Sequence, residues 1–243
     1  MARTAVNPTL IADIGMSEGN DSDFYLRKGF RVLGIEADPV MYQTLLSRFS
    51  APIAEGRIAI LNRAAAETSG AAVRFFRNRS VQGHSRVVLE DSPIPVPGEI
   101  VEVRTIGWPD IVRDFGLPYY SKIDIEGSEP HFLKSFVGSA GLPTFISAEI
   151  HTFEPVELLY QLGYRRFKIV NQARPDLFRQ PCPPLEGTYA EQPRWQHSSG
   201  PFGRELAGEW VDLKEAAVLF DIIQQARRLQ MWDWFDVHAH MPD

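Results

Sequence analysis

A glycine-containing turn between an apolar run and a helix-like segment constrains the fold of this chain most strongly. Residues 10–12 read LIA and lead directly into residues 13–19, which read DIGMSEG. A second apolar run ends in Glu36, about 20 residues after Gly15. Strand, glycine turn, helix, strand and terminal acid form the layout of a nucleotide-binding βαβ unit. The sequence therefore predicts a site for an adenosine-type cofactor.

The details of this turn favour S-adenosylmethionine (SAM) over a dinucleotide. Gly15 and Gly19 are spaced Gly-x-x-x-Gly, whereas a pyrophosphate requires the tighter Gly-x-Gly-x-x-Gly. Asp13 places a carboxylate where it would repel a phosphate and attract an ammonium group. SAM has an ammonium group, no phosphate, and a ribose diol that Glu36 could bind. NAD and a glycine turn without a ligand stay open, whereas a Walker loop is excluded because no Gly-Lys-Ser/Thr occurs.

The composition is that of an ordinary globular protein. The 243 residues suffice for one domain with a full core, and 44% are hydrophobic. A net charge of −6 argues against a nucleic acid or an anionic membrane as the partner. We find no apolar run of transmembrane length and no signal-peptide stretch. The single Cys182 excludes a disulfide framework or a Cys-based zinc site and fits a cytoplasmic location. A homo-oligomer stays open.

Apolar and amphipathic segments alternate along most of the chain. Alternation of this kind predicts an α/β fold with a doubly wound, mostly parallel sheet. The predicted strands are 9–14, 31–36, 57–62, 119–125, 143–150 and 164–170. The predicted helices are 20–29, 40–49, 108–115, 129–136, 154–162 and 212–230.

A β insertion interrupts this alternation after the third predicted strand. Residues 71–76 and 99–105 have strand-like patterns, and the turn-rich stretch 92–98 lies between them. We expect one domain over residues 1–243, with its core at about 8–170 and a C-terminal lid region at about 171–243.

The C-terminal region begins with a long irregular stretch. Residues 171–209 are rich in proline and aromatic residues, which is typical of a packed lid. The apolar stripe of helix 212–230 indicates core packing. The aromatic residues of the C-terminal region could wall a substrate pocket, pack this helix onto the sheet or form a dimer surface. His238 and His240 would share a face if the tail were extended, but we expect a mobile end there.

A second motif lies at the end of a buried strand. Residues 119–129 read YYSKIDIEGSE, and Asp124 leaves the strand where doubly wound folds bind their ligands. Carboxylates so close together are costly to bury without partners. We assign a functional role to Asp124. For Glu126 and Glu129 a structural role is equally plausible, because Glu129 would favour a helix N-terminus.

Several spaced motifs together resemble the FkbM family of SAM-dependent methyltransferases. They are residues 122–129 (KIDIEGSE), 146–150 (ISAEI) and 29–39 (GFRVLGIEADP), within a resemblance that spans about residues 10–170. The resemblance implies a Rossmann-like class I methyltransferase fold, SAM as donor, and O-methylation of a sugar or natural-product-like small molecule. The glycine turn departs from the commoner GANxGxx of the family. Residues 197–203 (HSSGPFG) resemble a segment of some members.

The resemblance also implies which residues would hold SAM. Asp13 and the glycine turn would hold the methionine part, Glu36 the ribose, and the end of the third strand the adenine. The implied set is Asp13, Gly15, Met16, Ser17, Glu36, Ala37, Asn62, Arg63, Ala64, Asp124 and Ile125.

Transfer of a methyl group to a hydroxyl requires alignment of the two groups and removal of a proton. The candidate bases are Asp124, Glu149, His151 and His84. His151 should point to the same side as Glu149, by the period of two in a strand. No metal is expected as a requirement, although Asp124, Glu149 and His151 could bind Mg²⁺ or Mn²⁺. An NAD-linked oxidoreductase and a catalytically silent SAM-binding module are the alternatives.

Overall fold

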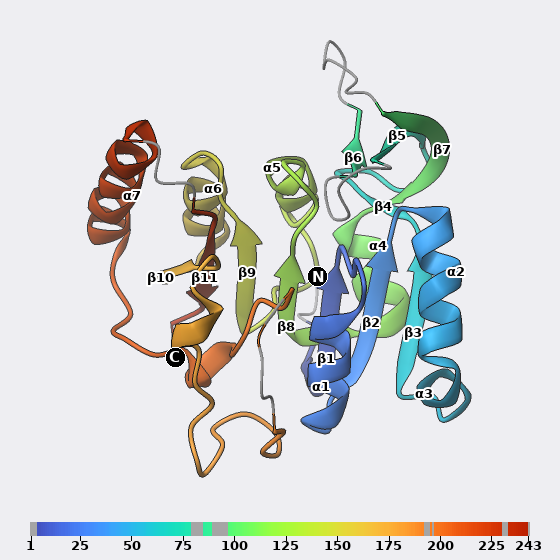
Figure 1. The fold of residues 1–243 in the computed structure, drawn as a ribbon, viewed down its shortest axis with the longest axis horizontal. Coiled ribbons are helices and arrows are strands. Elements are labelled where there is room, and N and C mark those ends of the chain that lie inside the picture. Colours follow the sequence, from blue (N-terminus) through green and yellow to red (C-terminus); the bar gives the residue numbers. More distant parts are fainter. Residues whose placement is uncertain are drawn as a thin grey trace.

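A seven-stranded sheet forms the centre of the molecule (Figure 1). The computed structural model describes residues 4–78, 85–88, 97–191, 195, 197–229 and 233–242. The strand order is β10-β11-β9-β8-β1-β2-β3, and all neighbours pair in parallel except β11, which is antiparallel to both of its neighbours. The strands are β1 (Val6–Ile14), β2 (Arg31–Glu36), β3 (Ile58–Asn62), β8 (Leu117–Ile123), β9 (Phe145–Glu149), β10 (Arg166–Asn171) and β11 (Phe235–His240).

Helices cover both faces of this sheet, as a doubly wound fold requires. Alternate residues of β1 point to opposite faces, so Ala12 packs in one core cluster and Ile11 in the other. Residues of α4 (Trp108–Phe115), α5 (Glu129–Lys134), α6 (Glu154–Leu162) and α7 (Leu213–Arg228) join the first cluster. Residues of α1 (Asn20–Arg27), α2 (Pro39–Arg48) and α3 (Ser50–Ala54) join the second. The predicted Rossmann-like α/β fold is confirmed, and among the described helices none has the length and hydropathy needed to cross a bilayer.

The β insertion forms a second, smaller sheet. It contains β4 (Ala64–Ala65), β5 (Ala72–Asn78), β6 (Arg86–Val87) and β7 (Gly98–Ile106) in the order β4-β7-β5-β6. The predicted strands 71–76 and 99–105 are therefore confirmed, whereas most of the predicted turn 92–98 lies outside the described residues. Since β4 follows β3 after one residue, the small sheet starts at the carboxyl edge of the main sheet, as Figure 1 shows.

The C-terminal tail completes the main sheet, so the prediction of a mobile end was wrong. Strand β11 lies between β9 and β10, where Val237 and Ala239 are fully buried. These alternating apolar side chains join the first core cluster. Burial, with Lys168 nearby, lowers the pKa of His238 to about 3 and keeps its ring neutral. The core therefore extends beyond residue 170 to include the tail.

The segment 171–209 packs beside α1, on the same face of the sheet. Phe202 stacks on Tyr120 with ring centroids 4.7 Å apart, and Trp195 meets Phe24 edge-on. In Figure 1 the orange part of this segment lies on the side of the main sheet away from the small sheet. The prediction of a packed segment agrees with these contacts, which belong to the hydrophobic core.

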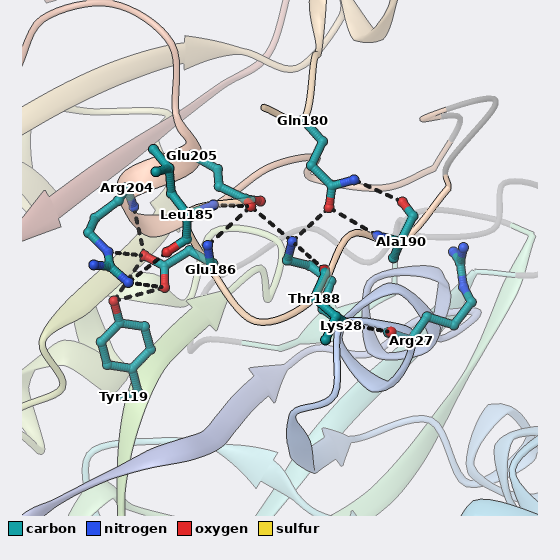
Figure 2. Close-up of polar contacts among 10 residues, drawn as sticks. All are labelled: Arg27, Lys28, Tyr119, Gln180, Leu185, Glu186, Thr188, Ala190, Arg204 and Glu205. Atoms are coloured by element: carbon teal, nitrogen blue, oxygen red, sulfur yellow. Dashed lines mark hydrogen bonds and ion pairs between the residues drawn. The ribbon is translucent and has the colours of Figure 1, made fainter. Parts of the chain in front are cut away.

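Two buried carboxylates tie this segment to the main sheet (Figure 2). Glu205 accepts a hydrogen bond from the Lys28 ammonium at 3.0 Å, and neither side chain is exposed to solvent. Glu186 accepts from the Tyr119 hydroxyl at 2.9 Å and from the Arg204 guanidinium at 3.1 Å. Burial lowers the pKa of Lys28, and Glu205 opposes this effect. The ion pair fastens the segment to the end of α1.

We expect Lys28→Met to lower the free energy of unfolding by about 3–5 kcal/mol, because Glu205 would remain buried without its cation. Arg57→Met is the matched control, since its ion pair with Glu55 is exposed and should contribute at most about 1 kcal/mol. Urea unfolding of both variants measures the difference. Equal losses in the two variants would contradict the assignment.

Candidate functional site

A cavity of about 540 Å³ lies between the carboxyl edge of the main sheet and the small sheet. Open α/β sheets bind ligands at this edge, beyond the ends of the strands. Most of the residues predicted to hold the cofactor line the cavity, namely Gly15, Ser17, Glu36, Ala37, Arg63, Ala64, Asp124 and Ile125. Among the described residues, no lining residue comes from the segment 171–209, so the cavity wall is built from strand ends, the start of α2 and the small sheet.

Gly15 brings the glycine turn against the end of β8. Its φ of 86° lies in the left-handed region, and a Cβ built there would come within 1.8 Å of the carbonyl oxygen of Asp124. Its N–H donates to the Ile35 carbonyl at 2.9 Å, which joins the turn to the end of β2. A side chain is therefore excluded at this position, and the ends of three strands meet around one backbone turn.

Glu36 presents a buried carboxylate at the end of β2. Its two oxygens accept the backbone N–H groups of Ser17 at 2.9 Å and Asp38 at 2.8 Å. Each carboxylate oxygen has a further lone pair, so the group can still accept hydroxyl donors from a ligand in the cavity. Burial raises the pKa of Glu36 to about 7, against the lowering effect of the two N–H bonds. This geometry suits a vicinal diol.

Three residues predicted to hold the cofactor do not line the cavity. Asp13 is fully buried and accepts the Ser22 hydroxyl at 2.6 Å, so its side chain is turned toward α1 instead of the cavity. The Asn62 amide donates to the carbonyl oxygens of Glu36 and Ala37 at 2.9 and 3.0 Å. Met16 is also buried. Asn62 thus fixes the backbone of Glu36 and Ala37, while Asp13 ties the end of β1 to α1.

Three carboxylates lie close together beyond the carboxyl end of β8. Ligand oxygens of Asp124, Glu129 and Glu149 lie within 4.8 Å of one another. The His151 ring contacts the Glu149 carboxylate at 3.1 Å, and this hydrogen bond raises the pKa of His151. Glu149 therefore lies near Asp124 and in contact with His151, and Asp124 alone of these three lines the cavity. The fourth candidate base, His84, lies outside the described residues.

This cluster differs from the predicted metal site. The third carboxylate is Glu129, whereas His151 hydrogen-bonds Glu149 and is not in the group that could share an ion. Glu129 also accepts the N–H of Ile125 at 2.8 Å, which commits one of its oxygens to the protein backbone. Three carboxylate oxygens have the chemistry of a Mg²⁺ site, but each of the three carboxylates already has a protein partner: Glu129 the N–H of Ile125, Glu149 the His151 ring, and Asp124 the Lys122 ammonium.

Glu126 is a residue for which a structural and a functional role were equally plausible from the sequence. It lines the cavity and adopts a left-handed backbone conformation with φ 57°. Burial, together with the charges of Asp124 and Glu149, raises the pKa of Glu126 to about 8. The following Gly127 is a sign of a tight turn, but only the structure shows that this turn aims the carboxylate at the cavity.

Lys122 is a residue of the site to which no role was assigned from the sequence. Its ammonium lies 3.2 Å from a carboxylate oxygen of Asp124, 3.2 Å from Asp21 and 3.8 Å from Asp13. These carboxylates hold the pKa of Lys122 well above its usual range despite burial. A lysine two residues before Asp124 in a buried strand was the available signal.

The doubly wound sheet and the cavity at its carboxyl edge define a Rossmann-like protein. A model of the methyltransferase FkbM domain family matches residues 13–169, and the chain belongs to this family. Membership implies SAM as the cofactor. No curated protein matches the chain.

Several solved structures are similar to this chain. The FkbM methyltransferase from Methylobacillus flagellatus KT is 23% identical over 67% of this chain and 39% of its own, with a TM-score of 0.42. A precorrin-6Y C5,15-methyltransferase from Geobacter metallireducens is 10% identical over 98% and 82% of the two chains, with a TM-score of 0.43. A SAM-dependent O-methyltransferase from Thermotoga maritima is 9% identical over 98% and 61%, with a TM-score of 0.42. The chain therefore spans about two fifths of the Methylobacillus protein.

We expect Gly15→Ala to destabilise the protein by about 3 kcal/mol or more, because strain at positive φ adds to a clash with the Asp124 carbonyl. Gly70→Ala is the matched control: Gly70 has φ 84° but open space where a Cβ would lie, so strain alone costs about 1 kcal/mol. Urea unfolding compares the two variants. Similar losses would show that the close approach is unimportant.

The buried Glu129 should make stability fall as pH rises. Burial raises the pKa of Glu129 from 4.5 to about 7, so between these values the folded protein keeps a proton that the unfolded chain has released. Such a group lowers the free energy of unfolding by up to about 1.4 kcal/mol per pH unit in this window. Glu129→Gln should flatten the profile measured by urea unfolding from pH 4.5 to 7, while the exposed Glu157→Gln should not. An unchanged slope in Glu129→Gln would refute the assignment.

Proposed function

We propose that the chain is a SAM-dependent O-methyltransferase that acts on a hydroxyl group of a small molecule, such as a sugar or natural-product-like metabolite. The observation that carries the proposal is the buried Glu36 carboxylate at the edge of a 540 Å³ cavity, with lone pairs left for a ribose diol. Membership of the FkbM family supports SAM as the ligand of this site.

The lining residues divide between the two ends of the cofactor. Glu36 would accept the ribose hydroxyls, while Ala37 and Ala64 offer apolar contact to the adenine. The backbone turn at Gly15 would hold the methionine part, beside the end of β8. In this orientation the sulfonium would lie toward the Asp124 carboxylate, which is 39% exposed.

The reaction needs an aligned acceptor and a proton acceptor. The methyl group leaves the sulfonium for the acceptor oxygen, SAM becomes neutral S-adenosylhomocysteine, and the hydroxyl proton passes to a carboxylate. Asp124 and Glu126 are the carboxylates of the β8 end that line the cavity. With a pKa of about 8, Glu126 mostly carries its own proton near neutral pH and becomes a proton acceptor as the pH rises through 8, so Asp124 would be the acceptor at lower pH. Glu149, which lies near Asp124 and contacts His151, would influence the charge of Asp124 from outside the cavity lining.

Family membership weighs against the NAD-linked oxidoreductase, and the catalytically silent module is a matter for experiment. A silent module would bind SAM, and its Asp124→Ala variant would behave like the parent protein with every acceptor. We also propose a cytoplasmic enzyme without a nucleic-acid or membrane partner. The net charge of −6 and the single, exposed Cys182 support this. A homo-oligomer is compatible with the exposed apolar residues of α7, such as Val218 and Ile222.

We expect Glu36→Gln to weaken binding of S-adenosylhomocysteine by about 10- to 100-fold, because the amide replaces one acceptor with a donor that faces a backbone N–H. Isothermal titration calorimetry measures the dissociation constants. Glu55→Gln, an exposed glutamate on the same half of the molecule, is the control and should bind like the parent. Incubation with SAM and a panel of hydroxylated acceptors, with and without a chelator, then identifies methylated products by mass. Tight binding of NAD(H) without binding of SAM or its product would overturn the proposal.

A further inference from the structure

A row of buried polar side chains crosses the face of the sheet that carries α1. In the strand register, Lys122 on β8 lies beside Asp13 on β1 and Ser147 on β9. Ser147 accepts or donates a hydrogen bond of 2.7 Å with the Tyr120 hydroxyl. Polar groups in such a position are costly to bury and usually serve a specific arrangement. Lys122 is the cation of this row.

The Lys122 ammonium joins two carboxylates that lie on different elements. It is 3.2 Å from Oδ2 of Asp21 in the first turn of α1 and 3.2 Å from Oδ2 of Asp124 at the cavity. Only 5% of the Lys122 side chain is exposed, so solvent screens these contacts weakly. A shift of either carboxylate therefore moves the shared ammonium group and with it changes the position of the other carboxylate.

The second oxygen of Asp21 holds the C-terminal segment. Oδ1 of Asp21 accepts the Ser198 hydroxyl at 2.6 Å and the N–H of Ser199 at 2.8 Å. The Asn20 amide donates to the carbonyl of His197 at 3.3 Å. Residues 197–199 thus lie at the start of α1, directly after the glycine turn. These contacts explain what the polar residues of the HSSGPFG stretch do in the fold.

The rest of this stretch is fixed independently of Asp21. Phe202 stacks on Tyr120 and meets Tyr25 edge-on. Glu205 forms the buried ion pair with Lys28 that Figure 2 shows. The segment therefore has its own anchors, and the hydrogen bonds of residues 198–199 add a link between a fixed segment and Asp21.

We propose that Lys122 is a positioning residue that links the cavity carboxylate Asp124, through Asp21, to residues 198–199 of the C-terminal segment. The segment thereby sets the orientation of Asp124 without lining the cavity. This inference rests on the proposed role of Asp124 in methyl transfer. Removal of either end of the link should reduce turnover while the cofactor, held mainly by Glu36 and the glycine turn, still binds.

The kinetic test compares three variants with an acceptor that the mass assay identifies. Lys122→Gln should lower kcat about tenfold or more while KM for SAM changes less than about threefold. Lys122→Arg should restore most of the loss, because a cation returns to the same place. Ser198→Ala should lower kcat several-fold, and the double variant Lys122→Gln/Ser198→Ala should be no worse than Lys122→Gln alone.

Two controls separate this link from general effects of buried polar groups. Lys168→Gln removes another buried lysine, whose ammonium donates to the Leu206 carbonyl at 2.6 Å at the end of the same segment. Ser139→Ala removes a hydroxyl that donates to the Gly141 carbonyl at 3.0 Å, away from the cavity. Both controls should keep the parent kcat, even if Lys168→Gln unfolds at lower urea concentration.

Amide hydrogen exchange tests the link without any turnover. The Ser199 N–H should exchange faster in Lys122→Gln than in the parent protein, because Asp21 loses the cation that fixes it. Should Lys122→Gln not fold, the kcat of Ser198→Ala decides. Parent-like kcat in Ser198→Ala, or losses that multiply in the double variant, would overturn the inference. Failure of the proposed function can be told apart from failure of this link. In the first case the parent protein would not bind S-adenosylhomocysteine, and the Ser199 exchange rate would still decide whether the link exists.

Discussion

The close approach of Gly15 to the carbonyl of Asp124 is the constraint on which the rest of the site depends. It holds the glycine turn of β1 against the end of β8, and the hydrogen bond of Gly15 to Ile35 adds the end of β2. Glu36 then closes the turn by binding the N–H of Ser17. A cavity can form at this edge because three strand ends share one backbone turn that no side chain separates.

Burial of carboxylates sets the electrostatics of this edge. Desolvation raises the pKa of Glu36 to about 7, of Glu126 to about 8 and of Asp13 to about 6. Lys122 is the cation placed among Asp13, Asp21 and Asp124, so it offsets part of their mutual repulsion. The site thus combines carboxylates that can release or take up protons near neutral pH with one carboxylate fixed by a buried ammonium.

Local patterns predicted the elements of the core well. The alternation of apolar runs and amphipathic segments located the core helices and strands up to β10 within a few residues, because they bury continuous apolar surfaces. The short helix α3 (Ser50–Ala54) was not predicted. The predictions failed where burial depends on distant partners. Strand β11 was expected to be mobile, because its short VHAH pattern does not by itself predict a strand. It becomes a strand by pairing with β9 on one side and β10 on the other. The segment 171–209 was correctly expected to pack. Its position depends on contacts with α1 that the sequence pattern does not reveal.

The sequence by itself determined the doubly wound fold, the glycine turn after β1 and the place of Glu36 at the end of β2, because these depend on residue order, strand periodicity and the glycine at position 15. Only the tertiary structure decided which carboxylates share the cavity. Asp13 turned toward Ser22, Glu129 joined Asp124 and Glu149, and Glu126 entered the cavity through a left-handed turn. These outcomes depend on distances between side chains that are far apart in the chain, and such distances are set by packing and not by local pattern.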